Sequence, residues 1–102
     1  MLPVEITEKN FDFRVAENRG TVILGFVEEG SAPCRMLSPI MEEIAAERAD
    51  LLVGRVDVRH DPALAAAFGV DAVPTVICLR DGALLGSFCG VRNKDGILEI
   101  VG

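Results

Sequence analysis

The feature that most constrains this chain is an unbroken apolar strand that leads directly into a helix. The segment Thr21–Val27 is rich in β-branched residues and lacks the polar alternation of a half-exposed strand. A turn at residues 28–31 follows, and apolar residues then recur at helical spacing from Met36 to Ala46. A strand buried on both faces needs helices on both sides of its sheet, so the pattern predicts an α/β fold.

The other segments extend this alternation to the order β-α-β-α-β-α-β-β-α. Asp81-Gly82 favours a two-residue hairpin, which makes the last two strands antiparallel. We expect Thr7, Ser31, Asp61 and Asn93 to cap helices, and Pro39 to kink the second helix. The remaining strands are expected at Val4–Ile6, Leu51–Val58, Val73–Leu79 and Ala83–Cys89, and the remaining helices at Thr7–Asn18, Asp61–Phe68 and Lys94–Val101.

Length and hydropathy predict one domain that covers residues 1–102. The chain has 102 residues and half of them are hydrophobic, which suffices for one core. No apolar run approaches the ~20 residues that a membrane-spanning helix needs. The N-terminus also lacks a basic region followed by an apolar stretch, so it does not predict a signal peptide, and a chain whose leader has been removed would look the same. From the number and spacing of the cysteines we expect a cytoplasmic location, and from the hydropathy no membrane partner.

Charge and cysteine content argue against several classes of function. The net charge is −6 and the arginines are scattered, whereas nucleic-acid binding needs a basic face. Three widely spaced cysteines do not form a disulfide framework, and one histidine with no Cys-x-x-Cys pair gives no metal site. We therefore expect no nucleic-acid partner, no metal and a reducing environment.

The stretch Gly30-Ser31-Ala32-Pro33-Cys34 contains the candidate catalytic residues of the chain. A Cys-x-x-Cys sequence between a strand and a helix is a redox motif, but here serine holds the first position. A serine hydroxyl does not attack a disulfide as a thiolate does. Ser31 is expected to cap the helix, which is compatible with the loss of a catalytic cysteine. Cys34 is either a buried, slow thiol or a thiolate favoured by the helix dipole.

Three groups of residues resemble the thioredoxin family. The first is Ala32-Pro33-Cys34-Arg35-Met36, followed by Ser38-Pro39-Ile40. The second joins Asp57-Val58 and Asp61-Pro62 with Phe68-Gly69-Val70, and the third is Val73-Pro74-Thr75. The resemblance runs from about Phe11 to Ile100 and implies the thioredoxin fold, a central mixed five-stranded sheet flanked by four helices.

The resemblance also implies the roles of single residues. Cys34 aligns with the resolving cysteine, and Pro74 would be cis and hold Val73 extended beside a bound peptide. Ser31 and Cys34 are thus the catalytic positions, and no cofactor is implied. The substrate groove would be lined by Gly30, Ala32, Pro33, Ala72, Val73, Pro74, Cys89 and Gly90.

The chain departs from the family pattern at four positions. Ser31 replaces the attacking cysteine, and Gly25 stands where many members bury an aspartate that accepts a proton. Val27 and Gly30 stand where tryptophans are usual. The attacking thiol, the buried base and the aromatic wall are therefore all missing.

These observations leave three functions open. The first is a thiol–disulfide oxidoreductase in which Ser31 abolishes dithiol turnover, with client proteins and a thioredoxin reductase as partners of a monomer. The second is a peptide-binding or chaperone module that uses the groove without redox chemistry. The third is monothiol exchange with glutathione through Cys34 or Cys89. Cys89 is either a partner for Cys34 or a small apolar strand residue, and Cys78 is expected in the core.

Overall fold

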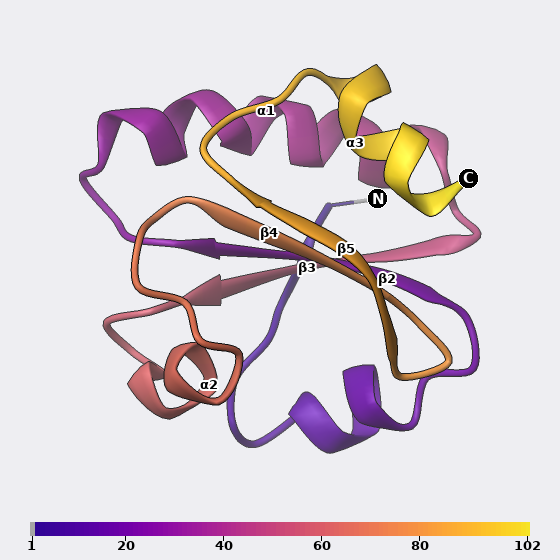
Figure 1. The fold of residues 1–102 in the computed structure, drawn as a ribbon, viewed down its shortest axis with the longest axis horizontal. Coiled ribbons are helices and arrows are strands. Elements are labelled where there is room, and N and C mark those ends of the chain that lie inside the picture. Colours follow the sequence, from indigo (N-terminus) through magenta and orange to yellow (C-terminus); the bar gives the residue numbers. More distant parts are fainter. Residues whose placement is uncertain (1) are drawn as a thin grey trace.

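The computed structural model describes residues 2–102, in which a twisted sheet lies between two layers of helices (Figure 1). Its elements follow the predicted order, and the first helical segment is a short π-helix, η1. Their bounds are β1 Val4–Glu5, η1 Asp12–Ala16, β2 Thr21–Val27, α1 Ala32–Glu47, β3 Leu51–Asp57, α2 Pro62–Ala67, β4 Thr75–Arg80, β5 Ala83–Cys89 and α3 Lys94–Val101.

The sheet is mixed and five-stranded, as the sequence predicted. Its spatial order is β1-β3-β2-β4-β5, so the apolar strand β2 lies at the centre. β2 and β1 both run parallel to β3, whereas β4 is antiparallel to β2 and to β5. Because β2 and β3 are parallel neighbours, the turns that follow them lie at the same edge of the sheet.

Two apolar cores lie on the two faces of the sheet. One is covered by α1 and α3 and contains Cys34 and Cys78, so Cys78 is buried as predicted. The other is covered by η1 and α2, where the ring of Phe68 contacts those of Phe11 and Phe26. β2 contributes side chains to both cores, which explains why it shows no polar alternation.

Three predictions of local structure were wrong. The helix expected over Thr7–Asn18 is confined to Asp12–Ala16, and Thr7 does not cap it. It starts late because the Asn10 side chain binds the Thr7 N–H and the Glu5 carbonyl and holds the preceding residues in a turn. At the other end the Asn18 side chain accepts the Gly20 N–H and donates to the Arg14 carbonyl. The fourth strand starts at Thr75, because Val73 and Pro74 belong to a turn that is closed by a hydrogen bond from Thr75 Oγ1 to the Ala72 carbonyl.

The third error concerns Asp61. Its carboxylate makes no capping hydrogen bond to α2 and instead accepts from the backbone N–H of Glu8, at 3.1 Å. The caps at Ser31 and Asn93 were predicted correctly: each side chain accepts a backbone N–H three residues ahead. No helix in residues 2–102 has the length and apolarity to cross a membrane.

Candidate functional site

The junction between β2 and α1 brings the motif residues to one end of the sheet. Gly30 has a φ of +89°, a left-handed conformation that a side chain would strain. The chain then enters α1, with Ser31 as N-cap and Pro33 in the first turn. Ser31 Oγ accepts the Cys34 N–H at 3.5 Å, so the hydroxyl is directed back over the turn that holds the thiol.

Cys34 is a free thiol in the wall of the α1–α3 core. It is only 6% exposed and belongs to the same apolar cluster as Val27, Leu37 and Met41. Its place in the first turn of a 16-residue helix lets the helix dipole act on its sulfur.

A turn before β4 and the end of β5 form the second part of the site. The Val73–Pro74 peptide bond is cis. The Pro74 carbonyl accepts the Gly90 N–H at 2.8 Å, which fastens this turn to the end of β5. Val73 is half-buried and packs against the cluster that contains Cys34. The fold thus brings residues 30–34, 72–74 and 89–90 to the same end of the sheet, although up to 60 positions separate them in sequence.

Cys89 is exposed and Cys78 is buried, so only Cys89 is accessible to reagents from solvent. Cys89 Sγ lies 3.6 Å from Thr75 Oγ1, beside the turn that contains Pro74. Burial raises the pKa of the Cys78 thiol to about 11, so this thiol stays protonated at neutral pH. All three cysteines are free, and the pairing of Cys34 with Cys89 stays a prediction.

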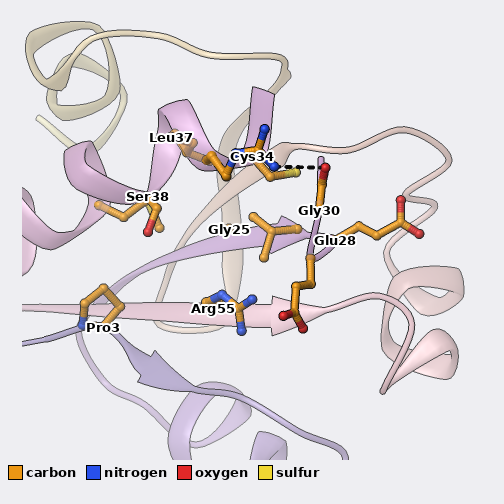
Figure 2. A pocket seen from close by; sticks show the side chains of 12 residues that line it. Pro3, Gly25, Glu28, Gly30, Cys34, Leu37, Ser38 and Arg55 are labelled. Carbon is orange, nitrogen blue, oxygen red and sulfur yellow. Dashed lines mark hydrogen bonds between the residues drawn. The ribbon is translucent and has the colours of Figure 1, made fainter. Parts of the chain in front are cut away.

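A cavity on the other flank of Cys34 was not predicted from the sequence. It has a volume of about 200 Å³ and lies between the first turns of α1 and the strands β2 and β3 (Figure 2). Its apolar wall includes Gly25, Val27, Leu37 and Met41, and Cys34 closes one end. The one signal in the sequence is Gly25, because a glycine inside an apolar strand often marks a close approach by another group.

The charged residues that line this cavity are Glu28, Glu29, Arg35 and Arg55, and three of them have a partner among the described residues. Arg55 Nη1 lies 2.8 Å from Glu5 Oε1, and Arg35 Nη1 donates to the Gly30 carbonyl at 3.0 Å (Figure 2). Glu28 lies 3.7 Å from Arg59. Residues 2–102 contain no cluster of three His, Cys, Asp or Glu side chains that could hold a metal ion.

Comparisons with known proteins agree on one family. The family profile of thioredoxin matches residues 3–102. The thioredoxin of Chlamydia caviae is 32% identical over 96 residues, which cover 94% of this chain and 92% of that protein. The thioredoxin of Listeria monocytogenes is 34% identical over 98 residues, with 95% and 93% covered.

A solved structure gives the same answer. A mutant thioredoxin from Halobacterium salinarum superimposes with a TM-score of 0.87 at 30% identity, and the match covers 98% of this chain and 88% of that one. The likeness therefore extends over nearly the whole chain in sequence and in fold.

Proposed function

The chain belongs to the thioredoxin family of thiol–disulfide oxidoreductases, and from this premise we propose that Cys34 is its exchange thiol and that Ser31 prevents the dithiol cycle. The observation that carries the proposal is the hydrogen bond from the Cys34 N–H to Ser31 Oγ. A capping hydroxyl occupies the position from which a first thiolate would attack, and hydroxyls are not nucleophiles toward disulfides at neutral pH.

The remaining thiol supports one half of the exchange reaction. The Cys34 thiolate attacks a client disulfide, a Cys34–client disulfide forms, and the client's other sulfur leaves as a thiolate that takes up a proton. With serine at residue 31, the motif has no second thiol to release the client. Net reduction then needs an external thiol that attacks the Cys34–client disulfide; without one, the client leaves only when its own freed thiolate re-attacks and restores the client disulfide.

The turn at residues 72–74 is the proposed binding surface for the client. Val73 precedes β4, so its backbone lies beyond the paired part of the sheet and is free to add a client strand. Ala72, Pro74, Cys89 and Gly90 surround it, and Gly30, Ala32 and Pro33 would form the opposite wall. The relatives support protein clients; a thioredoxin reductase as electron donor, a monomeric state and a cytoplasmic location are further parts of the proposal.

The proposal is tested by restoring the missing sulfur. The Ser31→Cys variant is expected to reduce insulin with dithiothreitol as electron source, whereas the wild-type chain stays near the uncatalysed rate. Ser31→Ala is the control, because it removes the hydroxyl without adding a thiol. A Ser31→Cys protein that folds but does not reduce insulin would refute the redox assignment.

The burial of Cys34 favours a second candidate function, the binding of peptides without redox chemistry. A thiol that is 6% exposed is poorly placed to meet a folded client. Client capture in excess reductant separates the two functions. Clients retained equally by the wild-type chain and by Cys34→Ser indicate a binding module. Clients captured by the wild-type chain without reductant, released when reductant is added and never captured by Cys34→Ser indicate thiol chemistry.

A further inference from the structure

The cavity beside Cys34 adjoins the proposed client groove and shares Gly30 and Cys34 with it. None of Ala72, Val73, Pro74, Cys89 and Gly90 contributes to its lining. It opens between α1 and the strands β2 and β3, on the flank occupied by Gly25, Ser38 and Arg55 (Figure 2). The turn at residues 72–74, to which a client strand would add, is therefore not part of the cavity.

Gly25 and Met41 lie against each other in the wall of the cavity. Gly25 lies in the middle of β2, where glycine is unfavourable by roughly 0.5–1 kcal/mol compared with alanine. A Cβ atom added there would lie 3.0 Å from Met41 Cε, so any side chain at residue 25 would press on this methyl group and push it into the cavity. The unbranched thioether of Met41 can adjust its shape to what lies next to it.

The dimensions and polarity of the cavity define its ligand. An apolar cavity of about 150 Å³ is large enough for benzene, and this one measures about 200 Å³. Of the charged residues in its lining, Arg55 and Glu28 form ion pairs and Arg35 donates to the Gly30 carbonyl, whereas Glu29 is exposed to solvent. A charged ligand inside the cavity would lose its water against a mostly apolar wall. Binding must therefore come from contact with the apolar wall.

We infer that this cavity binds a small, neutral, ring-sized apolar molecule, which covers Cys34 from that side and slows its thiol exchange. Cys34 forms one end of the cavity, and Figure 2 shows its sulfur turned toward Gly30 at the mouth. The binding itself is independent of the proposed function, whereas its effect on exchange rests on that function.

Binding is measured on the methionine methyl groups. The chain has three methionines; Met41 is 5% exposed and lies at the cavity, whereas Met36 is 65% exposed and serves as an internal control. In protein labelled with ¹³C at the methionine methyls, benzyl alcohol is expected to shift the Met41 signal in a saturable manner and leave Met36 unchanged. Benzoate and benzylamine, which have similar size but carry charge, are expected to produce no such shift. The absence of a Met41 shift with benzyl alcohol, or an equal shift with all three compounds, overturns the inference.

Filling the cavity provides the matched variant. Gly25→Val is expected to abolish the Met41 response, and Ser87→Val on the exposed face of β5 is expected to retain it. If Gly25→Val does not fold, Ser38→Leu at the mouth replaces it, since Ser38 is exposed on α1 and lines the cavity. A response that survives in the folded cavity variant also overturns the inference.

The effect on Cys34 is read separately from binding. The alkylation rate of Cys34 by iodoacetamide is expected to fall as the bound fraction reported by Met41 rises, because the ligand blocks approach from the cavity side, while the rate at Cys89 stays constant. An unchanged Cys34 rate at saturation refutes the regulatory effect. Failure of the proposed function has a different signature, namely the absence of a Cys34 mixed disulfide with a client when no small ligand is present.

Discussion

Two strand-to-helix junctions lie side by side at the same end of the sheet. The residue at the N-cap position of each helix forms a different kind of hydrogen bond. β2 passes into α1 through Ser31, and β3 passes into α2 through Asp61. Both helices have a proline in the first two positions, and the Val58 N–H donates to the Val27 carbonyl between the two turns. The local sequence pattern is therefore nearly the same at both junctions.

The difference lies in what each side chain meets. Ser31 accepts an N–H from its own helix, which stabilises the turn around Cys34. Asp61 is 4% exposed and accepts the Glu8 N–H, while its other oxygen lies 2.7 Å from His60 Nδ1. The Ser31 junction thus contributes to the candidate functional site, whereas the Asp61 junction holds the N-terminal segment. The reason is that the segment around Glu8 packs over Asp61 only.

The largest effect is expected at the buried junction. Asp61→Ala leaves the Glu8 N–H without its acceptor and is expected to lower the free energy of unfolding by about 1–3 kcal/mol, as measured by urea denaturation. Asp61→Asn is the control, since its amide oxygen can still accept this N–H and it should lose less. If Asp61→Ala is as stable as the wild type, the carboxylate does not hold the N-terminal segment.

A smaller effect is expected at the exposed junction. Ser31→Ala removes a helix cap and should lower the free energy of unfolding by about 0.5–1 kcal/mol, toward the lower end because the capping distance is 3.5 Å. Ser31→Asn should recover most of this loss. A loss as large as that of Asp61→Ala would contradict the comparison, because it would mean that Ser31 also has a long-range structural role.

The smallest expected effect is a pH dependence of the free energy of unfolding, which should arise from the Asp61 junction and not from the Ser31 junction. The hydrogen bond to Asp61, followed by the attraction of its charge, raises the pKa of His60. The stabilisation is therefore complete below the unfolded pKa, near 6.5, and is lost as the pH rises through the higher folded value. The stability difference between wild type and His60→Gln should shrink between about pH 6 and 8.

The serine junction is the internal control for this titration. The hydroxyl of Ser31 carries no titratable charge, so the difference between wild type and Ser31→Ala should stay constant over the same range. A constant difference for His60→Gln would contradict the ion pair.

The Asp61 carboxyl titrates at lower pH and with the opposite sign. Burial raises its pKa, but the hydrogen bonds from His60 and from the Glu8 N–H outweigh this and leave the pKa below its ordinary value. The stabilisation from Asp61 is therefore present above the unfolded pKa and is lost as the pH falls through the folded one. The wild-type chain should lose more stability in acid than Asp61→Asn does.

Local pattern was enough to predict much of the fold. The bounds of β2, β5 and α3 were predicted to the residue, because apolar composition, the Asp81-Gly82 turn and the Asn93 cap act within a few residues. The helix expected over Thr7–Asn18 was too long, mainly because propensity gave no sign that the Asn10 side chain would hold residues 7–10 in a turn before it. The motif at residues 30–34 was located correctly on a strand-to-helix junction for the same local reason.

The sequence by itself determined the order of the elements, the burial of β2 on both faces and the replacement of a thiol by a hydroxyl at residue 31. Tertiary structure alone decided the partner of Asp61, which lies 53 residues away, and the cavity between Gly25, Cys34 and Met41. The physical reason is the distance along the chain over which each interaction acts. Hydrophobic periodicity and capping act between near neighbours in the chain, whereas a buried carboxylate and a cavity are defined by groups that meet only after the sheet has assembled.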